Sequence, residues 1–137
     1  MIETPRVVET SGWSKVEWVS AAGGAKKYKP GYVASTSGSE LRIDTRRGGA
    51  QQVHVGYLKT YSSTAVASLG CVAPCTCPAQ DLRAHAHPRT STTTLSPSVR
   101  AESPSSTNCT LRLSLSTDGQ QFKLISLHVD AADGDRR

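Results

Sequence analysis

The sequence predicts an all-β domain, an antiparallel β-sandwich of jelly-roll or immunoglobulin-like type with about seven strands and one long polar loop. No segment carries apolar residues at helical spacing over three turns. Instead, short segments alternate apolar and polar residues, and clusters of Gly, Pro, Ser and Asp separate them. The length of 137 residues suits one domain. We expect a linker or entry segment over 1–12, the sandwich over 13–130 and a disordered tail over 131–137.

The strand predictions come from alternation. The predicted strands cover 13–20, 40–45, 52–59, 64–69, 107–116 and 121–129, with a short extended piece at 32–34. In 52–59, Val53, Val55 and Tyr57 share one face. Residues 121–129 are apolar on both faces, which predicts a strand in the middle of a sheet.

The loop predictions come from glycine, proline and small polar residues. The run AAGGAKKYKPG over 21–31 predicts a loop. Gly56 within an alternating segment indicates a bulge or a close backbone approach. Residues 78–108 are rich in Pro, Ser, Thr and Ala, and they predict one long loop with a possible edge strand at 90–95.

Four cysteines predict two disulfides. A Cys75–Cys77 bond is disfavoured, because residues two apart in an extended chain place their side chains poorly for bridge geometry. Cys109 would then bond to Cys75 or to Cys77, and Cys71 would bond to the other. Either bond would tie the segment beginning near Cys109 to the CxxxCxC segment.

A zinc site is the alternative use of these thiols. Four thiolates, or three of them with His85 or His87, have the donor chemistry of such a site. The spacing CxxxCxC lacks the paired CxxC of common structural zinc sites. We therefore expect disulfides, with no metal and no cofactor. His54 and His128 stand without partners on strands and read as structural.

Disulfides and the sequon at Asn108, a candidate glycosylation site, predict a secreted or secretory-pathway protein. The N-terminus lacks the basic and then apolar order of a signal peptide. The chain is therefore expected to be a fragment, or the C-terminal domain of a longer secreted protein. No run of 18 apolar residues is present, so no membrane partner is expected.

The charge pattern and the absence of catalytic motifs exclude several function classes. The formal net charge is +5, but the cations lie in separate loop-forming segments, so no nucleic-acid partner is expected. The sequence contains neither a Gly-x-Ser-x-Gly elbow nor a P-loop. The acidic pair Asp130 and Asp133 falls in the tail. These observations favour a chain without catalytic residues. We expect the chain to be a monomer.

Aromatic rings beside polar groups are what sugar-binding sandwiches use, because a ring covers the C–H face of a pyranose. Core packing is the alternative for each aromatic residue. The candidate glycan-binding residues are Trp13, Trp18, Tyr28, Tyr32, Tyr57 and Tyr61.

Several motifs, in order, resemble a known domain: KPGYVASTSGSEL, VGYLKTYSSTAVASLGCVAPCTC, NCTLRL and FKLISLHV. They look like the cysteine-containing β-domain of secreted plant and green-algal proteins, often C-terminal to an esterase-like region of the SGNH/GDSL type. The resemblance implies a secreted accessory domain. The Gly-Asp-Ser nucleophile block of such esterases is absent here, so no hydrolysis is assigned to this chain.

Two functions remain as expectations. The first is a non-catalytic extracellular accessory module of a larger secreted protein that binds polysaccharide. The second is a structural or protein-interaction domain that packs against an adjacent hydrolase-like domain.

Overall fold

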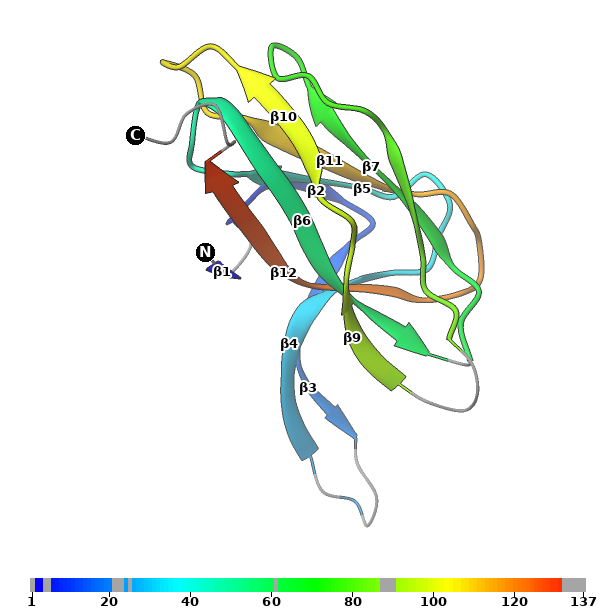
Figure 1. The fold of residues 1–137 in the computed structure, drawn as a ribbon. Helices are drawn as coiled ribbons and strands as arrows, with labels where there is room; N and C mark the ends of the chain where they lie inside the picture. The colour runs from blue at the N-terminus through cyan, green and yellow to red at the C-terminus, as the bar shows by residue number, and fades with distance from the viewer. Residues whose placement is uncertain are drawn as a thin grey trace.

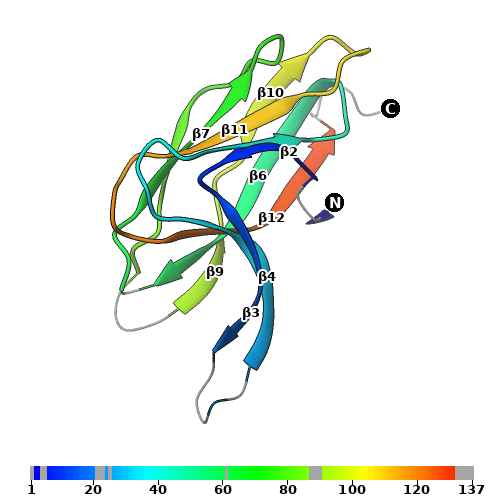
Figure 2. The same ribbon diagram turned by 180° about the vertical axis from the view of Figure 1, so that it is seen from behind.

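The structure is a computed structural model that describes residues 2–3, 6–20, 24, 26–60, 62–86 and 91–131. Over these residues the chain folds into two antiparallel sheets packed face to face, as Figures 1 and 2 show from opposite sides. This confirms the predicted all-β sandwich. In this part of the chain no helix is long and apolar enough to cross a membrane.

The seven-stranded sheet has the order β10-β6-β12-β4-β3, with β1 added beside β12 and β9 beside β6. Its strands are β1 (Ile2–Glu3), β3 (Ser14–Ser20), β4 (Lys26–Ala34), β6 (Gly49–Thr60), β9 (Ser91–Leu95), β10 (Val99–Ser103) and β12 (Phe122–Ala131). The β3–β4 hairpin extends beyond the body of the sandwich in Figure 1.

The five-stranded sheet has the order β2-β5-β11-β7-β8. Its strands are β2 (Arg6–Ser11), β5 (Glu40–Asp44), β7 (Val66–Val72), β8 (Gln80–Arg83) and β11 (Thr110–Leu115). The chain crosses from β2 to β3 at Gly12, which has a φ of 84°. A Cβ there would overlap the Oγ of Ser39, so this corner requires glycine.

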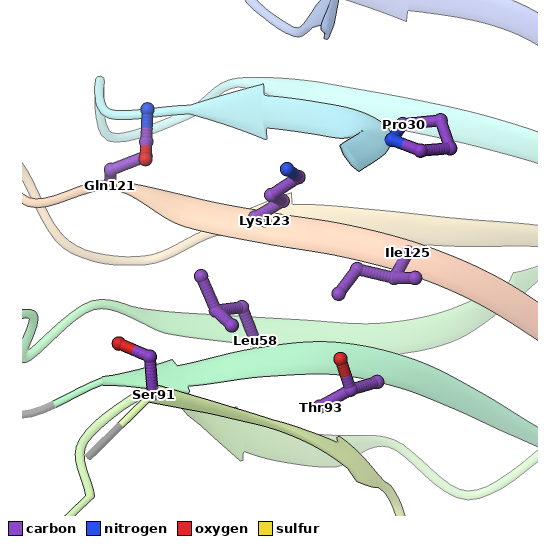
Figure 3. Close-up of a pocket in the computed structure, with 7 residues that line it drawn as sticks. All are labelled: Pro30, Leu58, Ser91, Thr93, Gln121, Lys123 and Ile125. Carbon is purple, nitrogen blue, oxygen red and sulfur yellow. The ribbon is translucent and has the colours of Figure 1, made fainter. Parts of the chain in front are cut away.

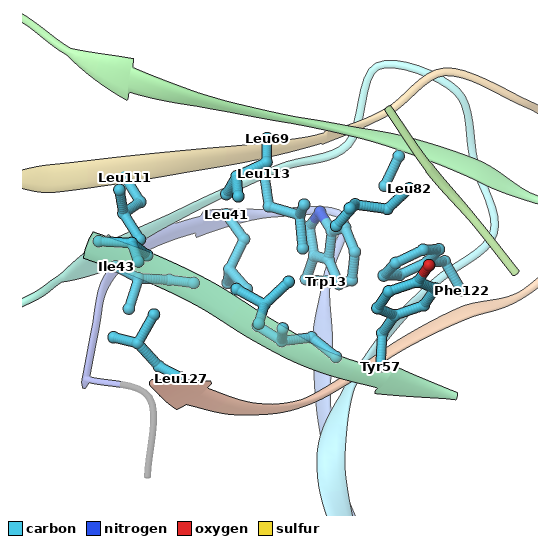
Figure 4. Close-up of a cluster of buried hydrophobic side chains, with 14 of the residues drawn as sticks. Trp13, Leu41, Ile43, Tyr57, Leu69, Leu82, Leu111, Leu113, Phe122 and Leu127 are labelled. Atoms are coloured by element: carbon cyan, nitrogen blue, oxygen red, sulfur yellow. The ribbon is translucent and has the colours of Figure 1, made fainter. Parts of the chain in front are cut away.

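The core lies between the sheets and consists of the inward residues of both (Figure 4). Leu41, Ile43 and Leu113 come from the five-stranded sheet and are fully buried. From the other sheet, Phe122 stacks on Tyr57 with ring centroids 5.4 Å apart, and Trp13 meets Phe122 edge-on at 6.1 Å. Aromatic packing of this kind fills much volume with few side chains.

Two loop predictions were wrong. The edge strand expected at 90–95 is confirmed as β9 (Ser91–Leu95), but residues 78–108 also contain β8 and β10, so they do not form one long loop and the estimate of about seven strands is too low. These segments lack apolar alternation because they pair at sheet edges. β9, for example, pairs with β6 from Thr60↔Ser91 to Gly56↔Leu95, and four of its five residues are exposed.

The second error concerns 21–31, whose C-terminal half belongs to β4. Gly31 pairs with Val16, and Tyr28 pairs with Trp18, so the register shifts between them. Two residues, Lys29 and Pro30, therefore oppose Glu17 alone. A proline is tolerated in a strand at such a bulge, where no ladder hydrogen bond from its nitrogen is needed.

A β-bulge in β12 explains why 121–129 reads as apolar on both faces. Leu124 pairs with Tyr57 and Ser126 with Gly56, so Ile125 is an extra residue. The strand changes face there, and Phe122 before the bulge and Leu127 after it both reach the same core. The strand does lie inside the sheet, between β6 and β4.

The four cysteines, all within the described residues, form two disulfides, Cys71–Cys77 and Cys75–Cys109. This selects one of the two pairings that the sequence left open. Cys75 follows a turn with a cis Ala73–Pro74 peptide, and its bond ties that turn to the residue before β11. The Sγ atoms of Cys71, Cys75 and Cys109 lie within 4.8 Å of one another, but the bonds engage all of them.

Candidate functional site

The outer face of the seven-stranded sheet carries the candidate site. In β6, Val53, Val55 and Tyr57 point into the core, so the alternate residues His54 and Leu58 point outward. The neighbouring strand β12 also presents side chains on this outer face, with Lys123 before its bulge and His128 after it. The site is therefore built on paired strands and does not depend on a single loop.

An open groove of about 460 Å³ lies on this face. Its lining comes from four strands and the residue before β12, as Figure 3 shows. The lining residues are Pro30 of β4, Leu58 of β6, Ser91 and Thr93 of β9, Gln121 before β12, and Lys123 and Ile125 of β12. In Figure 3 the β12 side chains lie between Pro30 on one side and the β6 and β9 residues on the other.

Lys123 is held close to β4. The residue is only 7% exposed, although it lines the groove. A Cβ on Gly31 would lie 2.7 Å from Lys123 Cε and 2.7 Å from the Leu124 carbonyl oxygen. Glycine at this position thus allows the β4 backbone to cover the aliphatic stem of the lysine.

The groove combines apolar and hydrogen-bonding groups. Leu58, Ile125 and Pro30 supply an aliphatic surface. Around them stand the hydroxyls of Ser91 and Thr93, the amide of Gln121 and the ammonium group of Lys123. Such a surface suits a ligand with an apolar face and many hydroxyl groups.

A second cluster lies on the same outer face beyond the bulge. His54 and His128 are directly paired across β6 and β12, with ring centroids 5.0 Å apart and planes at 82°. Ser126 Oγ lies 3.0 Å from His128 Nε2. Burial is the first cause, and His54 the second, of a lowered His128 pKa, so the neutral ring is favoured.

Among the described residues, two of the six aromatic candidates, Trp13 and Tyr57, lie in the core. Trp13 and Tyr57 are 5% and 4% exposed, so their rings belong to the core and offer no face to a ligand. Burial also raises the pKa of Tyr57. Tyr32 is half-buried and packs against the core.

The remaining candidates lie partly outside the described structure. The backbones of Trp18 and Tyr28 pair across β3 and β4, but their side chains are outside the described part, as is all of Tyr61. Asn108 is exposed, as a glycosylation site requires. His85 Nδ1 lies 3.2 Å from the Ser63 carbonyl oxygen, and His87 falls outside the described residues.

The sequence analysis missed the groove residues because none belongs to a chemical motif. A signal was present in Leu58 and Ile125, which break the alternation of their strands by placing an apolar side chain opposite the core face. Only the pairing of β6 with both β12 and β9 brings them beside Thr93.

No protein-family model and no curated protein matches this sequence. Solved structures do match. A carbohydrate binding module of lichenase 5A from Cellvibrio mixtus, in complex with cellotriose, has 13% identity and a TM-score of 0.56, and the match covers 96% of this chain and 99% of that chain. The C-terminal CBM6 of LamC, a marine laminarinase from Zobellia galactanivorans, has 11% identity and a TM-score of 0.51, with 88% and 91% covered.

A two-domain esterase active on acetylated mannans also matches, with 17% identity and a TM-score of 0.53. The match covers 93% of this chain but 35% of the esterase, so this chain spans about a third of that protein. At these identities the likeness establishes the fold, a sandwich that carbohydrate-binding modules also adopt.

Proposed function

We propose that this chain is a non-catalytic, extracellular accessory module that binds polysaccharide within a larger secreted protein. The observation that carries the proposal is the groove on the outer face of the seven-stranded sheet. Leu58 and Ile125 would contact the C–H face of a sugar ring. Lys123 and Gln121 would donate hydrogen bonds to its hydroxyls.

Three further observations support this function. Carbohydrate-binding modules share the fold, and one of them was solved in complex with cellotriose. The two disulfides suit an oxidising compartment. The matched esterase is about three times as long as the matched region, which is consistent with a module joined to a larger protein.

The alternative, a domain that only packs against a neighbouring hydrolase-like domain, requires a contiguous apolar patch. Among the described residues the exposed large hydrophobic side chains are Val8 and Leu95. Val8 lies in β2 of one sheet and Leu95 in β9 of the other. This arrangement favours the glycan-binding proposal.

Affinity electrophoresis tests the groove directly. The oxidised chain should be retarded in gels that contain a β-glucan, mannan or acetylated mannan, and retardation by none of a broad polysaccharide panel would contradict the proposal. Leu58→Arg should weaken binding at least about tenfold, because it replaces an aliphatic contact worth about 1.5–3 kcal/mol when fully buried.

Lys123→Met distinguishes the contribution of the ammonium group to glycan binding from that of the aliphatic stem. Methionine keeps most of the stem packing against Gly31, so the loss of a charged hydrogen bond should weaken binding about tenfold or more. Val8→Arg is the matched control, because it places the same new charge as Leu58→Arg on an exposed position of the other sheet. Equal weakening by Val8→Arg would place the binding outside the groove.

A further inference from the structure

The histidine pair on the outer face forms a preorganised arrangement of two imidazoles. His54 of β6 and His128 of β12 are directly opposite in the antiparallel register, so both rings project from one face at one level. Both side chains are half-buried. The sheet thus holds the rings together with little conformational freedom left to lose on binding an ion.

The spacing of the rings fits a shared ion. An imidazole nitrogen binds Zn²⁺ at about 2.1 Å, which places the ring centroid about 3.2 Å from the ion. Two such rings at a tetrahedral angle have centroids about 5.2 Å apart. The observed centroid separation is 5.0 Å, with the planes close to perpendicular.

Ser126 orients one of the rings. Its Oγ lies 3.0 Å from His128 Nε2, and when Oγ accepts a hydrogen bond from the Nε2–H, the lone pair is left on Nδ1. Gly56 is the cross-strand partner of Ser126, and a Cβ on Gly56 would overlap that Oγ. The glycine in β6 therefore provides the space for the hydroxyl that fixes the ring.

We propose that His54 and His128 bind a divalent transition-metal ion of the Zn²⁺ class, with Ser126 as a positioning residue. Imidazole ligands suit Zn²⁺, Cu²⁺ and Ni²⁺, whereas Ca²⁺ and Mg²⁺ prefer oxygen ligands. Water would complete the coordination. The exposed Asp130 lies two residues beyond His128 on the same strand face, where its carboxylate would offset part of the ion's charge.

Titration calorimetry with ZnCl₂ on the tag-free, oxidised chain tests the site. We expect one equivalent of Zn²⁺ to bind, and CaCl₂ to give no saturable signal. His54→Phe should abolish this binding, because phenylalanine keeps an aromatic contact with His128 but has no ligand atom. His128→Gln should also abolish it, and Ser126→Ala should weaken it about tenfold.

The other two histidines supply the matched control. The double variant His85→Gln/His87→Gln should bind Zn²⁺ with unchanged affinity, although it removes two imidazoles and each site variant removes only one. Loss of binding in this variant, with retention in His54→Phe, would overturn the proposal. Absence of saturable Zn²⁺ binding by the unmodified chain would also overturn it and leave the ring pair as a packing contact.

A measurement on the unmodified chain avoids dependence on how the variants fold. Histidine ring proton resonances in NMR spectra should respond to Zn²⁺ for two of the four histidines in the sequence, those assigned to His54 and His128. Shifts confined to His85 or His87 would contradict the site. Because the groove variants retain both imidazoles, failure of glycan binding leaves this test unaffected.

Discussion

Single glycines set how closely the strands of the seven-stranded sheet approach one another. Gly31 lies in β4 against Lys123 and the carbonyl oxygen of Leu124, with no room for a Cβ. Gly70 lies in β7 of the other sheet, and nothing would come within 4 Å of a Cβ there. Neither glycine has a positive φ, so the space around them, and not backbone conformation, distinguishes the two.

This difference predicts opposite effects of the same substitution. Gly31→Ala should lower the free energy of unfolding by about 1–3 kcal/mol, because the new methyl group forces a shift of β4 against β12. Gly70→Ala should be neutral or raise it by about 0.4–1 kcal/mol, because alanine restricts the unfolded chain. Urea unfolding of both variants measures the effect, and equal destabilisation would contradict the packing at Gly31.

At the scale of elements, the two disulfides constrain the chain unequally. Cys71–Cys77 closes a sequence separation of 6 and ties β7, which contains Cys71, to the segment that follows it. Cys75–Cys109 closes a separation of 34 that contains β8, β9 and β10. The second bond therefore holds three edge strands whose own sequences have little apolar alternation.

Removal of each bond should reflect this difference. Chain entropy gives about 4 kcal/mol for a separation of 34 and about 2 kcal/mol for 6. The variant Cys75→Ala/Cys109→Ala should thus lose more unfolding free energy than Cys71→Ala/Cys77→Ala. Alanine is chosen in place of serine, because a serine hydroxyl would be left without a hydrogen-bond partner at the buried positions 75 and 109.

Denaturant unfolding and limited proteolysis of the two double variants measure this. Only the Cys75→Ala/Cys109→Ala variant should become sensitive to cleavage between β8 and β10. Greater destabilisation from loss of the Cys71–Cys77 bond would mean that native-state packing, and not loop closure, determines the effect.

At the scale of the whole molecule, the two sheets differ in what their outer faces offer. The groove and the histidine pair both lie on the outer face of the seven-stranded sheet, on either side of the β12 bulge. The outer face of the five-stranded sheet carries polar side chains such as Arg42, which forms an ion pair with Glu40 at 2.9 Å. A single, half-buried surface pair of this kind contributes little to stability.

The number of free thiols in the intact chain tests the proposed secretory location. Alkylation of the unfolded, non-reduced chain should add no alkyl group to the intact mass, and alkylation after reduction should add four, because all four cysteines are bonded. Four alkylated thiols without reduction would contradict the disulfides and remove the support that they give to the proposed secretory location.

The sequence by itself determined the fold class and the strongest strands. Alternation in Glu40–Asp44 and Thr110–Leu115 was readable because one face of each strand is buried and the other is not. The short spacing of Cys75 and Cys77 also disfavoured a bond between them, and the two cysteines are bonded to other partners. These features depend only on residues that are close in the sequence, so they can be predicted without knowledge of the tertiary structure.

Tertiary structure decided the edge strands, the disulfide pairing and the groove, because each of them depends on which strands pair. The edge strands β8, β9 and β10 are strands only because β7 and β6 provide hydrogen-bonding partners. The bulge at Ile125 turned an apparently two-faced strand into one that reaches a single core. The choice of Cys75 as the partner of Cys109 and the burial of Trp13 and Tyr57 depend on non-local contacts. So does the presence of Leu58 and Lys123 in one groove, which residue order alone does not specify.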